Sequence, residues 1–441
     1  MSEHIAIVGG GMLGLSLALK YAQAGQRVAV FEAASGFGGM ASAWSLGHIA
    51  WDRFYHVSLL SDTHTHALLG ELDLQEDFVG VETKTGFYTD GQLHSMSNSL
   101  EFLKFPPLGL LGKFRLGLTI MRASRIRDWQ AMEKIDCVAW LTRWSGRRTV
   151  EKIWRPLLRA KLGESHTEAS AAFIWATIQR MYAARRSGMK KELFGYIRGG
   201  YGRIVDALVR KLTALGVELQ CDAPVSQVTS SRAGPVVKFA DGQSRLYDRV
   251  IVTAAPPIAA KLLDIPEAER AKLNAIRYLG IVCASAVLEK PLGKFYVTNL
   301  TDDWVPFTGV IEMSALVNPS EFGGKHLVYL PKYVAPDDAI FAESDRSIRE
   351  RFTAALVRMY PHFDPRQVLA FEVARLRHVF PIPVRDYSQL VPQFGTTLPG
   401  VFQVNSSQIV NGTLNVNETL QLASRAFVEL SGRVPHAPAS V

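Results

Sequence analysis

Three glycines near the N-terminus have the spacing of a loop that binds a dinucleotide. Gly9, Gly11 and Gly14 form G-x-G-x-x-G between the apolar run HIAIV and a stretch with helical spacing, LSLALKYAQAG. Gly9 permits a tight turn, Gly11 lets the backbone approach a pyrophosphate, and Gly14 lets a helix pack closely on a strand. Glu32 ends the next apolar run, where a carboxylate can bond the ribose hydroxyls. The pattern predicts a dinucleotide site but does not distinguish NAD from FAD.

A second pair of glycines favours FAD. Gly38 and Gly39 follow Glu32 after a short interval, where an NAD-binding domain would ordinarily proceed to its next helix. This extension resembles the opening of the flavin-containing amine oxidases, a superfamily that also holds protoporphyrinogen oxidases, phytoene desaturases and UDP-galactopyranose mutases. The resemblance implies an FAD-dependent oxidoreductase.

The resemblance extends along essentially the whole chain and is closest to the protoporphyrinogen-oxidase-like branch. The segment IAWDRFYHVSLL matches one that lies against the flavin ring, and YIRGGYGRIVDALVRK leads through a helix and a strand towards the adenine end. The segment LPGVFQVNSSQIVNGTLNVNETLQ resembles the closing strand and helix, whose first amides face the flavin. The cofactor-binding residues that the resemblance implies are Gly9, Gly11, Met12, Leu13, Gly14, Glu32, Gly39, Met40, Arg53, Phe54, Tyr55, His56, Val225, Val416 and Asn417.

Three departures from the family pattern bear on the chemistry. Met40 stands where an arginine often follows the glycine pair, and IVNGTLNVN lacks the acid and arginine of the closing motif. The strand YLGIVCASAVLEK offers no equivalent of the lysine that amine oxidases place near flavin N5. The electron acceptor is therefore open, oxygen or another. Because no cysteine follows Cys283, we expect FAD to be noncovalent.

Two titratable side chains are candidates for catalysis. His56 can take a proton while hydride leaves for the flavin, or it can simply hydrogen-bond the cofactor or the backbone. Lys332 stands between tyrosines in LVYLPKYV, either facing the substrate or extending from an aromatic core. Asp52 is expected to pair with Arg53. The cysteines have no metal-binding spacing, and we expect no metal site.

These motifs require an α/β fold with a Rossmann-like FAD-binding domain assembled from three chain segments. The expected segments are 1–85, 195–265 and 395–435. The stretches between them, 86–194 and 266–394, are expected to form an inserted α+β substrate domain. The first insertion is predicted to be mainly helical because its apolar residues recur at i, i+3, i+4, whereas the second contains strand-like runs such as GIVCASAVLE.

Composition and charge indicate which classes of partner the protein can bind. The 441 residues are 48% hydrophobic and 20% charged, which fits a globular protein, and the net charge is +8. Residues 105–127 mix apolar side chains with Lys113, Arg115, Arg122, Arg125 and Arg127. Such a segment is typical of a helix at an anionic membrane surface, or else of a buried helix with a basic edge. Nucleic acid is disfavoured because no known binding module accompanies the charge.

The expected location is cytoplasmic, with membrane association on the cytoplasmic face if residues 105–127 contact lipid. The three cysteines fit a reducing compartment, and neither a signal peptide nor a spanning run is recognisable. The expected function is removal of hydride from a bulky, lipophilic small molecule. Alternatives are a non-redox mutase of the UDP-galactopyranose mutase type, a flavoprotein without turnover and, least of all, an NAD dehydrogenase. A mutase would need paired arginines, drawn from Arg180, Arg185, Arg186 and Arg385.

Overall fold

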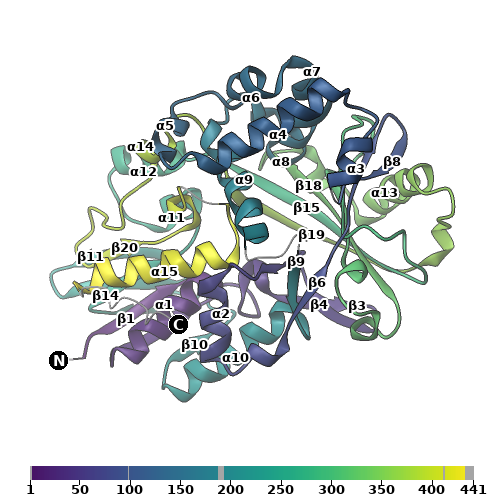
Figure 1. Cartoon of the computed structure of the whole chain (residues 1–441). Coiled ribbons are helices and arrows are strands. Elements are labelled where there is room, and N and C mark those ends of the chain that lie inside the picture. The colour runs from purple at the N-terminus through teal and green to yellow at the C-terminus, as the bar shows by residue number, and fades with distance from the viewer. Residues whose placement is uncertain (1, 98, 187–192, 411–412, 433–441) are drawn as a thin grey trace.

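A computed structural model describes the chain except for residues 1, 98, 187–192, 411–412 and 433–441. Its described part contains a five-stranded sheet with its helices and a larger seven-stranded sheet, and a group of helices lies over the seven-stranded sheet (Figure 1). The first and last described elements, the strand His4–Val8 and the helix Val416–Ser431, both lie on the side of the five-stranded sheet (Figure 1).

The five-stranded sheet is parallel and draws its strands from distant parts of the chain. β1 lies at its centre, paired with β2 and β14. Nearly every residue of these three strands is buried, as expected for a parallel sheet covered on both faces. In spatial order the strands are β10 (Glu218–Gln220), β2 (Arg27–Phe31), β1 (His4–Val8), β14 (Arg249–Val252) and β20 (Val401–Gln403).

Different elements cover the two faces of this sheet. On one face, Ile5 and Ile7 of β1 share a core with four helices. On the other, Ala6 and Val8 pack with a small antiparallel sheet and two further helices. The first group is α1 (Met12–Gln23), α2 (Thr63–Glu71), α10 (Gly200–Ala214) and α15 (Val416–Ser431). The second is β11 (Val225–Ser231), β12 (Gly234–Phe239), β13 (Ser244–Leu246), α11 (Pro256–Leu262) and α12 (Glu267–Ala275).

The seven-stranded sheet is built around β15, which is buried over its whole length. β15 pairs antiparallel with β18 on one side and with β19 on the other. The strand order is β19 (Val368–Pro381), β15 (Tyr278–Leu288), β18 (His326–Val334), β17 (Gly309–Glu312), β16 (Val297–Leu300), β7 (Thr85–Thr89) and β8 (Gln92–Ser95). The stretch 86–194 therefore opens with strand, and its helices begin only afterwards.

Helices cover both faces of this second sheet. The amphipathic helix α13 (Asp345–Met359) packs on one face through residues such as Ile348 and Phe352. The other face shares the largest core with residues from a run of helices. That run is α3 (Ser99–Lys104), α4 (Leu110–Arg125), α5 (Trp129–Glu133), α6 (Cys137–Ser145), α7 (Arg147–Thr149), a π-turn (Val150–Trp154), α8 (Arg155–Leu162) and α9 (Ala171–Arg186).

Smaller elements connect the two halves. A hairpin of β3 (Ala43–Leu46) and β4 (Ile49–Asp52) lies beside α10, and a three-stranded sheet has the order β5-β9-β6. The strands of that sheet are β5 (Ser58–Leu59), β9 (Leu193–Ile197) and β6 (Phe78–Glu82). Within the described residues, no helix has the length and hydropathy required to span a bilayer.

Candidate flavin site

The glycine-rich loop leaves an open space at the first turn of α1. Gly9 has a φ of 113°, and a Cβ on Gly14 would overlap the Gly9 carbonyl oxygen, so both positions require glycine. By contrast, a Cβ on Gly11 would meet no described atom within 4 Å. Gly11 caps α1 without a side-chain hydrogen bond, and Met12 and Leu13 follow with buried side chains. The first amides of a helix have no intrahelical acceptor, so this turn can bind an anion.

Glu32 and the second glycine pair surround this loop. The Glu32 carboxylate accepts hydrogen bonds from the backbone N of Gly10 at 2.7 Å and of Ala34 at 2.9 Å. The backbone N of Gly38 donates to the Gly10 carbonyl at 2.8 Å. Gly39, with a φ of 57°, lies against Gly11 so closely that a Cβ would approach the Gly11 Cα to 3.2 Å. The two glycine motifs therefore form one surface.

The chain that leads to Val225 joins the same surface. The backbone N of Ala223 donates to the Glu32 carbonyl at 2.9 Å, and the backbone N of Asp222 donates to the Ala34 carbonyl at 3.0 Å. Val225 is half-buried and opens β11. Met40, the residue in place of the family arginine, is half-buried against the large core.

The expected pairing of Asp52 with Arg53 is wrong. The Asp52 carboxylate is buried and accepts from the backbone N of Tyr201 at 2.7 Å and of Gly202 at 3.3 Å, so it holds the first turn of α10. The first amides of a helix have no intrahelical acceptor, and the buried Asp52 carboxylate supplies one here. The Arg53 guanidinium instead lies 5.6 Å from the Trp44 ring centroid.

The β3–β4 hairpin and the segment after it hold several buried nitrogen atoms without partners in the described structure. They include Nε of Arg53 and Nδ1 of His56. His56 Nδ1 is 3.7 Å from Asp52 Oδ2, beyond hydrogen-bond distance, and its ring lies 4.8 Å from that of Tyr201. The indole nitrogens of Trp44 and Trp51 are also unpaired. Buried polar groups are normally satisfied, so this concentration fits a segment that contacts a polar cofactor.

Phe54 and Tyr55 have different surroundings. Phe54 is buried in the large core, so its side chain supports the segment from behind. Tyr55 is only partly buried, and its hydroxyl lies 2.9 Å from the Tyr333 hydroxyl of β18. Tyr329 lies four residues earlier on the same face of β18, and its hydroxyl donates to the Asp52 carbonyl. This face of β18 therefore meets the segment that the resemblance places at the flavin ring.

The structure puts Lys332 on the other face of β18. Residues alternate along a strand, and Lys332 shares its face with Leu330 and Val334, which pack with α13. Its charged neighbours are Arg351, Asp338 and Glu343, and burial, followed by repulsion from Arg351, lowers the pKa of Lys332. This position fits the alternative of a lysine at the edge of an aromatic core, on the face of β18 opposite Tyr333.

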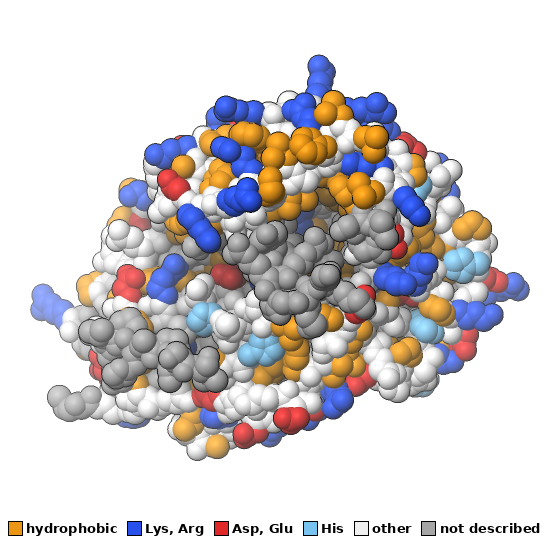
Figure 2. All heavy atoms as spheres, viewed as in Figure 1, with side chains coloured by type: hydrophobic (Ala, Val, Ile, Leu, Met, Phe, Trp, Pro, Cys, Tyr) orange, Lys and Arg blue, Asp and Glu red, His pale blue; other side chains and the backbone are white. Residues whose placement is uncertain are grey.

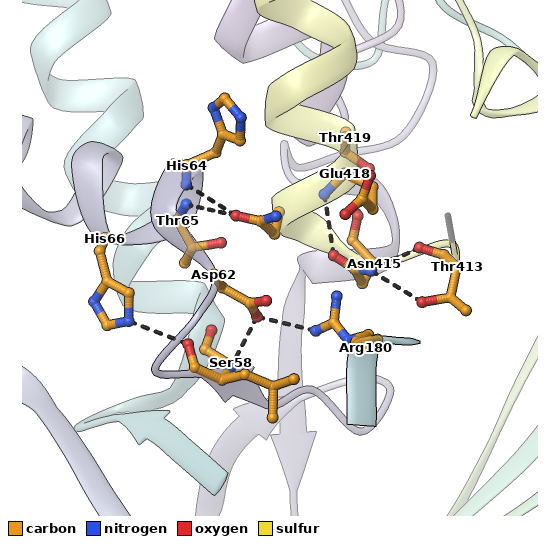
Figure 3. A network of polar contacts seen from close by, with 12 residues as sticks. Ser58, Asp62, His64, Thr65, His66, Arg180, Thr413, Asn415, Glu418 and Thr419 are labelled. Carbon is orange, nitrogen blue, oxygen red and sulfur yellow. Dashed lines mark hydrogen bonds and ion pairs between the residues drawn. The ribbon is translucent and has the colours of Figure 1, made fainter. Parts of the chain in front are cut away.

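The N-terminus of α15 contributes backbone rather than side chains (Figure 3). Asn415 caps the helix by accepting from the backbone N of Glu418 at 3.0 Å. The Asn417 side chain accepts from the backbone N of His64 at 2.9 Å and of Thr65 at 3.3 Å, at the start of α2. Only the backbone amides of Val416 and Asn417 therefore remain to face a ligand, and within the described residues neither has a hydrogen-bond partner.

Arg180 of α9 is occupied by an ion pair beside this helix. Its Nη2 lies 3.0 Å from Asp62 Oδ2, and Asp62 also accepts from the backbone N of Leu59 at 2.9 Å (Figure 3). Burial raises the pKa of the neighbouring Glu418 carboxyl. Arg180 is therefore engaged between α9 and the chain before α2 and is not free to clamp a diphosphate. The side chains of Arg185 and Arg186 lie outside the described residues, and Arg385 is exposed.

Sequence reasoning missed several residues that the fold brings to this region. Lys161 of α8 donates to the Tyr333 hydroxyl at 3.0 Å, and Trp44 lies beneath Arg53. Neither stands in a recognisable motif, and each reaches the site only through pairing of distant segments. The Gly-Gly turn before α10 was a usable signal for Tyr201, whose backbone N binds Asp52.

Known proteins share this architecture. A zeta-carotene desaturase from Synechocystis sp. is 24% identical over 445 residues, covering 85% of this chain and 86% of that protein. A candidate protoporphyrinogen oxidase from Exiguobacterium sp. 255-15 superposes with a TM-score of 0.77 at 16% identity, covering 98% of this chain and 99% of that one. A reduced UDP-galactopyranose mutase has a TM-score of 0.73 at 14% identity, covering 98% and 94%. At these identities the structural likenesses show the fold alone.

The family comparison is more specific than the structural one. Residues 13–406 match the model of the flavin-containing amine oxidoreductases, a span that begins within α1 and holds Glu32, the second glycine pair, the segment after β4 and the seven-stranded sheet. The glycine surface fits a dinucleotide, and the unpaired nitrogens around β4 fit contact with a polar cofactor. The chain belongs to the flavin-containing amine oxidoreductase family and is an FAD-dependent oxidoreductase.

Proposed function

We propose that this protein binds FAD noncovalently and uses it to remove hydride from a bulky, lipophilic small molecule. The observation that carries the proposal is the occurrence of an open glycine surface at Gly11 together with unpartnered buried nitrogens at Arg53 and His56. The likeness to a zeta-carotene desaturase favours a lipophilic substrate and dehydrogenation. The structural likeness to UDP-galactopyranose mutase adds no such support, because Arg180 is engaged by Asp62.

Residues from all three chain segments of the expected FAD-binding domain would hold the cofactor. We assign the pyrophosphate to the first amides of α1, the ribose to Glu32, and the adenine end to Val225. The isoalloxazine is assigned to the segment after β4 and to the amides that open α15. This arrangement agrees with a division into an FAD-binding domain (1–85, 195–265, 395–435) and a substrate domain (86–194, 266–394). The full set is Gly9, Gly11, Met12, Leu13, Gly14, Glu32, Gly39, Met40, Arg53, Phe54, Tyr55, His56, Val225, Val416 and Asn417.

When bound, FAD supplies the acceptor for a hydride. The protein's part is to orient the substrate, keep water away and compensate charge. The amides of Val416 and Asn417 stand at the positive end of α15, where they stabilise an anionic acceptor. His56 Nδ1, unpaired and held near Asp52, can give or take a proton at that atom.

A basic and apolar surface over α3 and α4 offers the route for a lipophilic substrate. Leu110, Leu111 and Phe114 are 79%, 72% and 70% exposed, and a groove of about 440 Å³ runs beside them. Figure 2 shows apolar side chains gathered over this part of the molecule with Lys and Arg around them. The exposed basic residues of these and neighbouring elements include Lys104, Arg122, Arg125, Arg127, Lys134, Arg143, Arg147 and Arg148. We propose that this surface lies on an anionic membrane.

The cofactor proposal is tested by the visible spectrum of the purified protein before and after heat denaturation. Flavin bands that move to the supernatant support noncovalent FAD. Anaerobic bleaching of those bands by a panel of lipophilic polyenes, alcohols and amines then identifies the substrate class. A protein that remains colourless after incubation with FAD contradicts the proposal, and tight binding of a UDP-sugar without bleaching favours a mutase.

The membrane proposal is tested by sedimentation with vesicles of phosphatidylcholine alone or with phosphatidylserine. The wild type is expected to sediment with the anionic vesicles. Leu110→Glu combined with Phe114→Glu is expected to abolish sedimentation, whereas Leu390→Glu, at a 45% exposed leucine elsewhere, serves as the matched control. Equal sedimentation of all three proteins contradicts a contact through α4.

A further inference from the structure

Three polar side chains from separate elements form a short hydrogen-bonded chain. Lys161 of α8 donates from Nζ to the Tyr333 hydroxyl at 3.0 Å, and its Nζ lies 4.4 Å from the centroid of that ring. The Tyr333 hydroxyl lies 2.9 Å from the Tyr55 hydroxyl. The order is therefore Lys161, Tyr333, Tyr55.

Of the two hydroxyl protons of Tyr55 and Tyr333, one has no acceptor among the described residues. An ammonium group donates only, so its bond to Tyr333 uses a lone pair and no hydroxyl proton. The bond between the two tyrosines uses one of their two protons. Among the described residues, neither hydroxyl has a further partner. Whichever tyrosine donates to the other, one hydroxyl proton of the pair points to an acceptor outside the described protein.

The charge of Lys161 selects the tyrosine that keeps this proton. A cation that donates to Tyr333 draws electron density from its oxygen and makes its O–H the stronger donor. Tyr333 then donates to Tyr55. The proton left over belongs to Tyr55, at the end of the chain farthest from the charge.

Tyr55 stands where a bound molecule can accept that proton. It lies in the segment that also holds the unpaired nitrogens of Arg53 and His56. Burial raises the pKa of Tyr55 well above its ordinary value, with a further contribution from Tyr333, yet part of the side chain remains accessible. A side chain that is largely enclosed yet partly accessible can be reached by a bound molecule.

We propose that Tyr55, backed by Tyr333 and Lys161, is a hydrogen-bond donor that recognises an oxygen acceptor in the site. The acceptor is either a carbonyl or hydroxyl oxygen of the substrate or a carbonyl oxygen of the isoalloxazine. In the first case the substrate is an oxygenated lipophilic molecule rather than a hydrocarbon. The inference rests on the proposed function, because it requires FAD and a substrate in this space.

The experiment uses the FAD-loaded enzyme and two probes of equal length, 2-undecanone and undecane. Their dissociation constants are measured from perturbation of the flavin absorbance, and the flavin carbonyl stretches are recorded by Raman spectroscopy without a probe. The variants are Tyr55→Phe, Tyr333→Phe and Lys161→Met. Tyr329→Phe is the control, because its hydroxyl donates to the Asp52 carbonyl within the protein.

If the substrate provides the acceptor, the wild type binds the ketone more tightly, and Tyr55→Phe weakens ketone binding by about tenfold while leaving undecane unchanged. Tyr333→Phe and Lys161→Met weaken it by less, about threefold, because they act through Tyr55. If the flavin provides the acceptor, Tyr55→Phe raises the carbonyl stretching frequency and leaves the preference between probes unchanged. The control changes neither quantity.

Equal affinity of the wild type for both probes, together with an unchanged flavin stretch in Tyr55→Phe, overturns the inference. If Tyr55→Phe does not fold, Lys161→Met still tests it, since Lys161 is only half-buried. Failure of the proposed function looks different, since a protein without bound flavin gives no spectrum to perturb.

Discussion

The glycine surface around Gly11 and the tyrosine chain at Tyr55 present hydrogen bonds in different ways. At Gly11 the donors are backbone amides at the start of a helix, and side chains are kept away. At Tyr55 the donors are side chains from α8, β18 and the chain after β4. The first surface fits a group common to all dinucleotides, whereas the second can change by single substitutions without loss of the fold.

This difference predicts which property mutations at each place will change: folding, cofactor binding or ligand preference. Backbone donors cannot be removed by substitution, so they are blocked only by added volume. Side-chain donors can be removed one atom at a time. Variants at the glycine surface should therefore act on cofactor retention or on folding, and variants of the tyrosine chain on ligand preference.

The largest effect is expected for Gly11→Ala. The added methyl group meets no described protein atom within 4 Å but occupies the space assigned to the pyrophosphate. Crowding of about 1–3 kcal/mol would weaken FAD binding by about ten- to a hundredfold. The check is the FAD dissociation constant from fluorescence quenching, together with urea unfolding of the FAD-free protein, which should match the wild type.

Gly14→Ala is the matched comparison. Its methyl group would overlap the Gly9 carbonyl, so the FAD-free protein itself should be destabilised. If Gly11→Ala lowered the stability of the FAD-free protein as much as Gly14→Ala does, the space at Gly11 would not be a binding surface.

A smaller effect is expected for Asp52→Ala, which links the two regions. The substitution leaves the buried backbone N of Tyr201 without its acceptor and should lower the free energy of unfolding by about 1–3 kcal/mol. Asp52→Asn retains an acceptor oxygen and should cost less. The check is urea unfolding of both variants. If Asp52 did not stabilise the start of α10, both variants would be as stable as the wild type.

These cases also show what the sequence could and could not predict. The glycine loop, Glu32 and the second glycine pair lie close together in the chain, and their spacing fixes the local geometry that binds a dinucleotide. The partner of Asp52 could not be identified, because Tyr201 is brought to it by a hairpin packing on a distant helix. Lys161 reaches Tyr333 for the same kind of reason.

Strand register explains why Lys332 lies apart from the proposed site. The run LVYLPKYV was recognisable as a strand, but which face pointed to the site depended on pairing with β15 and on the helix behind it. A single sequence with apolar residues on both faces does not contain that information. The sequence therefore leaves both positions open for Lys332 and gives no signal for Lys161.

A further test concerns the ion pair that joins α9 to the chain before α2. Arg180→Met removes the partner of Asp62, whose carboxylate then retains only the backbone N of Leu59 among its described contacts. We expect a loss of about 1–2 kcal/mol in unfolding free energy, since a buried charge is left poorly compensated. Arg180→Met combined with Asp62→Asn should recover part of this loss, and a double variant no more stable than Arg180→Met would show that the pair itself does not hold the elements together.

The smallest effect is expected for Lys332→Met, and it gives the sharpest test of which face of β18 serves the site. Lys332 and Tyr333 are adjacent in sequence but point to opposite faces, so the substitution should leave the flavin spectrum, FAD binding and the preference between 2-undecanone and undecane unchanged. Burial already disfavours the charge of Lys332, as the lowered pKa shows, so the unfolding free energy should change by no more than about 0.5 kcal/mol. Lys161→Met differs in the same chemical way but lies behind Tyr333, and it should reduce the preference for the ketone if the substrate provides the acceptor. A reduction caused by Lys332→Met instead would place the site on the α13 face of the sheet, and the assignment of the tyrosine chain would then be wrong.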